Sequence, residues 1–530
     1  MSADSMGSSG SIGSIVKDVC APYIKPDGPG FAIAVIRDGE VVFAEGYGLA
    51  SLEFGVPITP ETRFDIASTS KQFTAAGIAL LEQDGKLSAG DDIRDYMPEL
   101  ARHYPKITVG QLVHHTSGVR DYIALAGMAG RYIENLSPED EVVELLARQR
   151  GLDFEPGSRF SYSNSGYLLM ARLVRLVSGV TFREFLHARI FGPLGMDSTF
   201  ARDDYREVVH RRATGYTPGP DGGMVVDNPW IDVVGDGAVQ TTVGDLALWD
   251  RQFYGSTLPD GDDLIRRLLV RGRLNDGTEL GYAYGLMLDE RGGRRTVHHG
   301  GSWGGFRSQF LRFPDDRLTV IVLANCPSTD PNAVAHGVAE RVLGLSGPGS
   351  GGAGGRAERP EAPDLADKVG WYRDAEGTTF LELLVSDEGP GVRLLGDVLP
   401  LEPAGSPKDG QQRFGIGGFG LDAALTVRAD GSLHVEVHHM LDATLRQVEG
   451  SAVPDPGLAG TYYSDELDAV YRITVDERGV RLRRGWREPE ELTPTGEGFY
   501  VSGLLVLEHS GPDITVKDPR AVGLRFTRRD

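Results

Sequence analysis

The spacing of apolar and polar residues changes its period within the first hundred positions of the chain. Two apolar runs, FAIAVI and VVFAEG, flank an Asp-Gly turn at residues 37–40, and this pattern predicts a β-hairpin over residues 31–46. From Ser68 to about Leu81 the apolar residues instead recur at helical spacing, and Asp84-Gly85 ends the run. The chain is therefore expected to open with a hairpin and to continue into a helix.

Strand patterns return only late in the first two thirds of the chain. Residues 90–290 are typical of helices and loops, whereas the segments TVHH, RSQFLRF and LTVIVLAN that follow are typical of strands. A last helical pattern covers residues 332–343. Two early and three late strands around a helical insertion predict one sheet whose halves are distant in sequence.

A segment rich in Gly, Ser and Pro, residues 344–364, separates this region from the rest of the chain. Its composition cannot pack a core, so we predict a flexible linker. After it, short alternating runs with Gly and Asp turns predict an all-β region that repeats itself. Two tandem antiparallel barrels or sandwiches explain the repeat, because closing a sheet protects its edges. The repeated positions are Gly370, Tyr372 and Glu376, which return as Gly460, Tyr462 and Glu466.

The net charge and the small number of cysteines exclude several classes of protein. A formal net charge of −22 over 530 residues argues against nucleic-acid and anionic-membrane partners, which are met with basic surfaces. Cys20 and Cys326 are too few for a disulfide framework. The first residues do not resemble a secretory signal, and no stretch approaches the roughly 20 apolar residues that span a bilayer. We therefore expect a soluble, cytoplasmic protein.

Ser68-Thr69-Ser70-Lys71 is the first stretch that indicates chemistry. Positions i and i+3 of a helix lie on one face, so the Lys71 amine can reach the Ser68 hydroxyl. At the first turn the helix dipole disfavours a charged amine, and a neutral Lys71 can then activate Ser68. The same spacing occurs at Ser14 and Lys17, but that copy lies in a Gly/Ser-rich N-terminus with no partner motif behind it.

Two further motifs follow in the chain. Tyr162-Ser163-Asn164 stands at the start of a helical run, where a phenol can shuttle a proton and an amide can hold a carbonyl or an amine. Later, VHHGGSWGGF at residues 297–306 places two histidines before a glycine-rich stretch. Taken alone, this stretch fits a strand end with a turn, and a zinc ligand is also conceivable.

Together the three motifs resemble those of the serine β-lactamase and penicillin-binding-protein-like hydrolases, which carry SxxK, then YxN or SxN, then KTG or HxG on a strand. The resemblance covers roughly residues 15–343. The family spacing to the Gly-Phe pair makes His299 the motif residue and places His298 on the other face of the strand. No cluster of further ligands supports zinc, so we expect no metal and no cofactor. Supporting segments are ITVGQLVHHTSGV at 107–119, LVSGVTFREFLHARIFGPLGMDST at 176–199 and GDGAVQTTVGDLALW at 235–249.

The resemblance implies a role for each motif residue. Ser68 would attack a carbonyl and form an acyl-enzyme, Lys71 and Tyr162 would handle its proton, and Asn164 would orient the reacting groups. The backbone N–H groups of Ser68 and Ser302 would form the oxyanion hole. His299 would replace the lysine that binds a substrate carboxylate. Gly300 and Gly301 would let the strand edge lie against the substrate.

The fold class implied is multidomain α+β. A β-lactamase/DD-peptidase-like catalytic domain, an antiparallel sheet with a helical insertion, is followed by two small antiparallel β-barrel domains. The expected divisions are a flexible N-terminus at 1–14, the hydrolase domain at 15–343, the linker at 344–364 and barrels at 365–452 and 453–530.

This architecture resembles that of the D-stereospecific aminopeptidases, in which a loop of the last barrel reaches the active-site mouth. An acidic loop at residues 465–468 or 487–491 would serve here. We therefore expect a D-aminopeptidase or D-amidase acting on a small peptide, amide or ester, because a largely neutral His299 weakens the β-lactamase interpretation. A D-Ala-D-Ala carboxypeptidase, an esterase, an acyltransferase and a non-enzymatic peptide binder stay open as alternatives, as does a homodimer.

Overall fold

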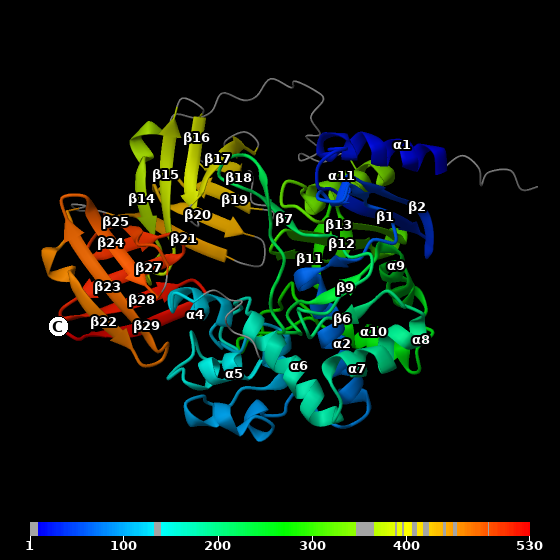
Figure 1. Ribbon diagram of the computed structural model, residues 1–530, viewed down its shortest axis with the longest axis horizontal. Helices are drawn as coiled ribbons and strands as arrows, with labels where there is room; N and C mark the ends of the chain where they lie inside the picture. Colours follow the sequence, from blue (N-terminus) through cyan, green and yellow to red (C-terminus); the bar gives the residue numbers. More distant parts are fainter. Residues whose placement is uncertain are drawn as a thin grey trace, which may run out of the picture.

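A six-stranded antiparallel sheet, in the order β10-β11-β12-β13-β1-β2, lies at the centre of the first part of the chain (Figure 1). The computed structural model describes residues 9–131, 139–345, 365–386, 389–394, 397–404, 411–416, 423–437, 441–448, 453–485 and 487–530. The strands of the sheet are β1 (Phe31–Arg37), β2 (Glu40–Tyr47), β10 (Met287–Arg291), β11 (Arg294–Trp303), β12 (Phe306–Phe313) and β13 (Leu318–Ala324).

The early hairpin and the late strands join in this sheet, which confirms the prediction. Strand β1 pairs with β13 in a register that sets Phe31 opposite Ala324 and Arg37 opposite Leu318. Strand β10 was not predicted, because its short MLDER sequence carries only two apolar residues. It pairs with the first half of β11 only, ending with Met287 opposite His298.

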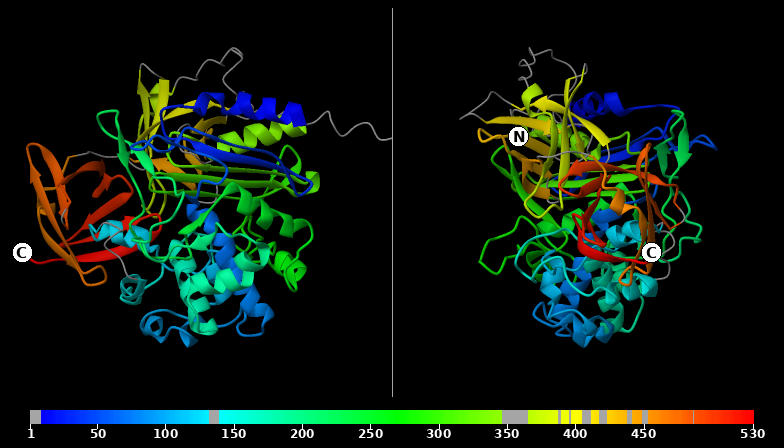
Figure 2. Two further views of the ribbon diagram at one scale, coloured as in Figure 1. Left: turned by 45° about the vertical axis from the view of Figure 1, so that its right-hand side comes forward. Right: turned by 90° about the vertical axis from the view of Figure 1, so that its left-hand side faces the viewer.

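Helices cover both faces of the sheet, which explains why FAIAVI is apolar without interruption. Phe31, Ile33 and Val35 pack under α1 (Ser9–Cys20) and α11 (Pro331–Leu343), whereas the residues between them face the helical insertion. Figure 2 shows α1 and α11 together on one side of the sheet and the insertion on the other.

The N-terminus departs from the prediction of a flexible segment at residues 1–14. Residues 9–14 form the first half of α1, and Ile12 is buried against the sheet. Lys17, which belongs to the other SxxK spacing, lies on this helix. Its Nζ is 3.9 Å from Oε1 of Glu45 in β2. Residues 1–8 lie outside the described ranges.

The helical insertion surrounds the N-terminus of α2, which begins at Lys71 and not at Ser68 as the apolar pattern predicted. Ser68 lies instead in a 3-10 turn, Ala67–Ser70, directly before the helix. The helices are α2 (Lys71–Gln83), α3 (Val109–Val113), α4 (Tyr122–Met128), α5 (Glu139–Ala147), α6 (Asn164–Ser178), α7 (Phe182–Leu186), α8 (Gly192–Leu194), α9 (Val243–Arg251) and α10 (Gly261–Leu268). Short strands between them are β3 (Leu49–Ser51), β4 (Val56–Pro57), β5 (Phe64–Asp65), β6 (Phe200–Ala201), β7 (Tyr216–Pro218), β8 (Met224–Val226) and β9 (Val239–Thr241).

Two closed eight-stranded antiparallel barrels follow, as expected for the all-β region (Figure 1). The first consists of β14 (Gly370–Arg373), β15 (Phe380–Ser386), β16 (Gly389–Leu394), β17 (Asp397–Pro403), β18 (Gln412–Ile416), β19 (Ala423–Val427), β20 (Leu433–Val437) and β21 (Leu441–Gln447). The second consists of β22 (Gly460–Ser464), β23 (Ala469–Asp476), β24 (Gly479–Arg484), β25 (Glu490–Gly496), β26 (Phe499–Ser502), β27 (Leu505–Ser510), β28 (Asp513–Asp518) and β29 (Ala521–Arg528).

The repeated tyrosines occupy the same place in the two barrels. Tyr372 and Tyr462 are both buried, and each hydroxyl donates to the carbonyl four residues earlier, Lys368 at 2.8 Å and Leu458 at 2.9 Å. The sequence repeat therefore corresponds to a structural repeat. Residues 346–364, most of the predicted linker, lie outside the described ranges, and the domain boundaries stay predictions.

The second barrel packs directly on the helical insertion. Its apolar residues belong to the same buried cluster as those of α2, α4 and α6. The Tyr471 hydroxyl donates to the Met128 carbonyl (2.6 Å), and Arg484 donates to the Gly127 carbonyl (2.6 Å). A Cβ on Gly130 would come within 2.6 Å of the Arg484 backbone, so glycine is required for this close contact. The barrel is therefore held against the end of α4.

Candidate active site

A cavity of about 640 Å³ lies beside the end of β11 that extends past β10. Its walls come from the turn before α2, from loops of the helical insertion, from β10, β11 and β12, from the segment that leads into α11 and, in the second barrel, from Arg520. A volume in this range suits a small ligand. Lys71 lies behind this wall, and every other residue that the sequence predicted for the site lines it: Ser68, Tyr162, Asn164, His299, Gly300, Gly301 and Ser302.

A strained turn holds Ser68 at the cavity. The preceding residue, Ala67, has φ +46°, a conformation that residues with a side chain seldom adopt. The Asp65 carboxylate accepts a hydrogen bond from the Ala67 N–H (2.8 Å), and the Ser308 hydroxyl of β12 donates to the Ile66 carbonyl (2.8 Å). These contacts tie the turn to the sheet and fix the direction of the serine.

Lys71 is fully buried, and three oxygen acceptors surround its Nζ. It donates to Ser68 Oγ at 3.0 Å, to Asn164 Oδ1 at 2.9 Å and to the Asp236 carbonyl at 2.7 Å. Burial lowers the pKa of Lys71 to about 8, while the carboxylate of Asp236 opposes this shift. A substantial neutral fraction is therefore present near pH 8, and this fraction can accept the Ser68 proton.

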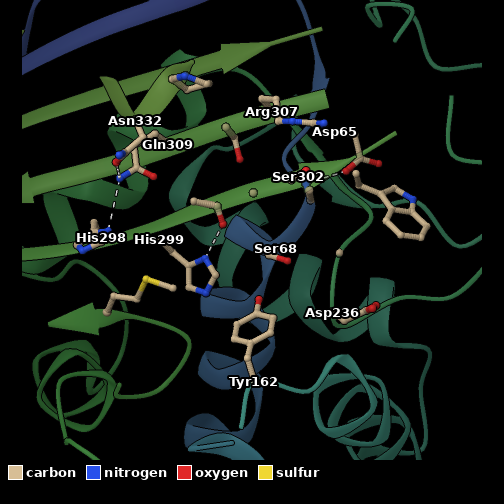
Figure 3. Close-up of a pocket in the computed structure, with 18 of the residues that line it drawn as sticks. Asp65, Ser68, Tyr162, Asp236, His298, His299, Ser302, Arg307, Gln309 and Asn332 are labelled. Atoms are coloured by element: carbon tan, nitrogen blue, oxygen red, sulfur yellow. Dashed lines mark hydrogen bonds between the residues drawn. The ribbon is translucent and has the colours of Figure 1, made fainter. Parts of the chain in front are cut away.

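Tyr162 completes the environment of the amine. Lys71 Nζ lies 4.9 Å from the centre of the Tyr162 ring, and Figure 3 shows the phenol oxygen pointing toward Ser68. Burial raises the pKa of Tyr162 above its usual value, and a hydrogen bond with Ser68 opposes the shift. The phenol therefore keeps its proton near neutral pH, which suits it to relay a proton and leaves Lys71 as the base.

Asn164, the first residue of α6, is held by a carboxylate that the sequence did not reveal. Asp121 Oδ2 accepts from the Asn164 backbone N–H (2.7 Å) and from its Nδ2 (3.0 Å). The amide nitrogen is thereby turned to Asp121, and the amide oxygen is turned to Lys71. Asp121 also caps α4 by accepting from the N–H groups of Ile123 and Ala124.

Asp236 and Arg520 bring two opposite charges to the side of the cavity near Asn164. Asp236 Oδ2 accepts from the Tyr122 hydroxyl at 2.8 Å. Burial raises the pKa of Asp236, while the Lys71 charge lowers it. Arg520, from the β28–β29 turn, has its Nη1 3.8 Å from Asp121 Oδ2, and the Asp121 charge raises the pKa of Arg520.

The two histidines point to opposite faces of β11, as strand alternation predicted. In Figure 3, His299 lies on the side of Ser68 and Tyr162, whereas Gln309 lies on the other side of the strand. His299 Nδ1 donates to the Gly300 carbonyl (2.6 Å), and its Nε2 lies 3.1 Å from the Tyr282 hydroxyl. His298 pairs instead with Asp289 at 2.8 Å. Both ring nitrogens of His299 thus have protein partners.

The glycines of β11 have two different physical reasons. A Cβ on Gly301 would overlap the Ile66 carbonyl oxygen, so this glycine lets the strand approach the turn that carries Ser68. A Cβ on Gly300 would instead come to 2.9 Å from Gln309 Oε1, the end of a flexible side chain. Strand β10 ends opposite His298, and the backbone from His299 to Ser302 lines the cavity beyond it.

The sequence of this chain is similar to that of a known protein family. A family model described as Beta-lactamase matches residues 18–344. The chain belongs to the beta-lactamase family. This membership confirms the superfamily that the three sequence motifs indicated.

Two curated relatives match different shares of this chain. A D-aminopeptidase from Brucella anthropi is 32% identical over 465 residues, which is 86% of this chain and 82% of the relative. A D-aminopeptidase from Gluconobacter oxydans is 34% identical over 301 residues, 56% of each chain.

Solved structures agree on the fold. An octameric penicillin-binding protein homologue from Pyrococcus abyssi has a TM-score of 0.58 at 25% identity and covers 83% of this chain and 100% of its own. The D-amino acid amidase from Ochrobactrum anthropi SV3, complexed with L-phenylalanine amide, has a TM-score of 0.51 at 24% identity and covers 63% and 97%.

Four residues beside this site were not among those predicted from the sequence. They are Asp121, Asp236, Tyr282 and Arg520. Asp236 lies in the supporting segment at residues 235–249, which indicated the family but no role for this residue, and the other three stand in none of the motifs. Asp121 precedes a helical run, which signals a cap but not a buried clamp. Arg520 reaches the cavity only because the second barrel is folded against α4.

Neither acidic loop predicted to reach the cavity does so among the described residues. Glu466 binds Arg120 at 2.8 Å, and Arg487 donates to the Arg131 carbonyl at 3.2 Å, both at the barrel interface. The barrel residue that lines the cavity is Arg520, a cation in place of the expected acid.

Neither a metal-ligand cluster nor a membrane-spanning helix is found in the described ranges. No group of three or more His, Cys, Asp and Glu residues could hold a metal ion there. Within the same ranges, no helix is long and apolar enough to cross a membrane.

Proposed function

We propose that this protein is a serine hydrolase that releases N-terminal D-amino acids from small peptides and amides through an acyl-enzyme on Ser68. The observation that carries the proposal is the 3.0 Å hydrogen bond from the buried Lys71 amine to Ser68 Oγ at the wall of a small-ligand cavity. The similarity to D-aminopeptidases over most of the chain supports the substrate class.

In the acylation step, Ser68 Oγ attacks the substrate carbonyl carbon and its proton passes to neutral Lys71. The oxyanion of the tetrahedral intermediate accepts from the backbone N–H groups of Ser68 and Ser302. The C–N bond then breaks, and the leaving nitrogen takes a proton through Tyr162. The products are an acyl-enzyme and a free amine.

Deacylation repeats these roles with water. Lys71 accepts a proton from the attacking water, the ester bond to Ser68 breaks, and the serine oxygen recovers its proton. Asn164 holds Lys71 in place through its Oδ1 (2.9 Å), and the buried Tyr282 contacts His299 through its hydroxyl (3.1 Å). The cycle uses side chains and backbone groups alone.

Asp236 is proposed to bind the free amine of the substrate. Its carboxylate lines the cavity, and Oδ2 already accepts from Tyr122, so Oδ1 is the oxygen that can accept from an ammonium. The Asp236 carbonyl touches Lys71, which sets this carboxylate near the reacting serine. A substrate with a free amino group next to the scissile carbonyl would therefore be favoured.

The first test is release of p-nitroaniline from D-alanyl-p-nitroanilide, its L-isomer and its N-acetyl form by the wild type and by Ser68→Ala. Turnover of the free-amine D-substrate alone, lost in Ser68→Ala, is expected. Turnover of the N-acetyl form at the same rate would favour an esterase, an acyltransferase or a D-Ala-D-Ala carboxypeptidase. Full activity of Ser68→Ala would contradict every one of these mechanisms.

Two further proposals concern the compartment and the assembly of the protein. We propose that the protein works in the cytoplasm, because Cys20 and Cys326 are both free and buried, as is common in a reducing compartment. A homodimer is the assembly that we propose, and light scattering on the purified protein tests it.

A further inference from the structure

Arg520 joins the second barrel to the residues that surround Lys71. It lies in the turn between β28 and β29, and its side chain is 21% exposed. Its carbonyl accepts a hydrogen bond from the Asp121 N–H at 2.8 Å. Its guanidinium faces the Asp121 carboxylate at 3.8 Å. The same barrel residue therefore touches both the backbone and the side chain of Asp121.

Asp121 in turn controls the orientation of Asn164. The Asp121 side chain has no exposure, and four N–H groups of the insertion point at its two oxygens. Its Oδ2 receives the Asn164 amide nitrogen, which leaves the amide oxygen to accept from Lys71. If the amide rotated by half a turn, its NH₂ group would face the lysine, and two donors would meet.

A buried carboxylate is costly unless an opposite charge compensates it. Arg520 supplies such a charge to Asp121 from outside the catalytic region. Without Arg520, the buried Asp121 carboxylate would lose the positive charge that faces it at 3.8 Å.

We propose that Arg520 is a positioning residue that acts through Asp121 and Asn164 to hold the Lys71 amine against Ser68. The proposal rests on the function proposed above, since it concerns the same acyl transfer. The second barrel thereby contributes a residue that helps to position the reacting amine.

The charges around Lys71 and Arg520 set the direction in which the pKa of Lys71 would shift if Arg520 were replaced. Lys71 faces Asp236, Asp121 and Arg520, together with the rings of Tyr162 and Tyr167. The two carboxylates raise the pKa of Lys71, and the Arg520 charge lowers it.

Besides Lys71, Arg520 faces three titratable groups. They are Asp121, Asp518 and Tyr162, and the Asp121 charge is the main cause of the raised pKa of Arg520. Removing the Arg520 charge should therefore raise the pKa of Lys71 and reduce its neutral fraction near pH 7.

The test is the rate at which a fluorophosphonate probe labels Ser68, measured from pH 6 to pH 10. In this reaction the Ser68 oxygen bonds to phosphorus, fluoride leaves and Lys71 takes the serine proton. The probe needs neither a free amine nor a D-residue, so its rate reports on Ser68 and Lys71 alone. The same variants are assayed with D-alanyl-p-nitroanilide.

For Arg520→Ala we expect a labelling rate lower by about 10²-fold at pH 7, because the amine is misplaced. We also expect the rise of the rate with pH to move to higher pH. Arg520→Lys keeps the charge and should return this rise to its wild-type position. Arg525→Ala, which removes an exposed arginine of the same barrel, should match the wild type.

Asp121→Asn provides a variant of opposite sign that keeps the shape of the residue. Since the Asp121 charge raises the pKa of Lys71, losing this charge should move the rise of the labelling rate to lower pH. If Arg520→Ala fails to fold, Arg520→Lys and Asp121→Asn still test the opposite shifts that the proposal requires.

Wild-type rates and pH dependence in Arg520→Ala would overturn the proposal. A lower rate with an unmoved pH profile would also overturn it, because a merely structural role would produce that result. A wild type that is labelled by the probe but does not hydrolyse the D-alanyl anilide would refute the proposed function and would leave the Arg520 test intact.

Discussion

Lys71 and Tyr162 stand side by side, and their opposite pKa shifts divide the proton transfer between them. Burial lowers the pKa of Lys71 to about 8 and raises that of Tyr162, so the amine loses its charge more easily while the phenol keeps its proton. The sequence motif implied that both residues handle the serine proton but left their order open. The two pKa shifts support our proposal that Lys71 is the base.

Tyr162→Phe tests this assignment. The phenol does not titrate near neutral pH, so we expect kcat to fall by about 10²-fold while the rise of the rate near pH 8 stays in place. The measurement is the fluorophosphonate labelling rate against pH, with kcat on D-alanyl-p-nitroanilide beside it. Disappearance of the rise near pH 8 would identify Tyr162 as the base instead.

Asp236→Asn tests the amine site. A charge-assisted hydrogen bond contributes about 1.5–3 kcal/mol, so the wild type should prefer the D-alanyl anilide to its D-lactyl analogue by roughly 10- to 100-fold. In Asp236→Asn the ratio of the rates with the two substrates should fall close to one. Because the ratio is taken within each variant, an effect of the substitution on Lys71 cancels.

Asp330→Asn is the matched control for this change. Asp330 also lines the cavity, and asparagine can still cap α11 as the aspartate does. The Asp330→Asn variant should prefer the D-alanyl substrate as strongly as the wild type does. An undiminished preference in Asp236→Asn would assign the amine to another group.

At the level of the elements, β11 and the turn before α2 form one unit. The Thr69 hydroxyl donates to the His299 carbonyl (3.1 Å), and the Ser308 hydroxyl donates to the Ile66 carbonyl (2.8 Å). Gly301 permits this close approach, because a side chain there would overlap Ile66. The distance between the serine and the strand that would bind substrate is therefore set by a residue without a side chain.

Gly301→Ala should push β11 away from the turn. We expect a loss of about 1–3 kcal/mol in the free energy of unfolding, together with a fall in kcat, because the Ser302 N–H moves relative to Ser68. Urea unfolding and turnover of the D-alanyl anilide measure the two effects. Gly300→Ala meets only the flexible end of Gln309 and should lose less stability; an equal loss in both variants would contradict the packing argument.

Across the whole molecule, buried ion pairs join the second barrel to the helical insertion. Arg120 is only 6% exposed and contacts Glu466 of the barrel at 2.8 Å and Asp153 at 3.4 Å. It also donates to the Val522 carbonyl, two residues after Arg520. The position of the β28–β29 turn in the active site thus depends on an interface that lies outside the cavity.

Arg120→Ala should destabilise this interface strongly, by about 3–5 kcal/mol, because it leaves buried carboxylates unpaired. Arg150→Ala is the matched control. Arg150 pairs with Asp465 at the same interface, but both side chains are more than half exposed, so we expect a loss of at most about 1 kcal/mol. Urea unfolding followed by tryptophan fluorescence measures both, and equal losses would contradict the interpretation of the interface.

Local patterns along the chain were sufficient to predict much of the fold and the family of the protein. The hairpin at residues 31–46, the helix at 332–343 and the repeat that sets Tyr372 and Tyr462 in equivalent places depend on short-range periodicity, and the structure agrees with each. The three motifs likewise led to the family, because their spacing along the chain is itself the signal.

Tertiary structure alone decided how the site is supported. Arg520 lies about 400 positions from Asp121 in the chain, and their contact exists because the second barrel packs on α4. The same holds for Asp236, which a fold of the insertion brings to Lys71. Sequence determined which groups carry the chemistry, since that depends on residue type and local spacing. Which charges surround them depends on long-range packing, which no local pattern encodes.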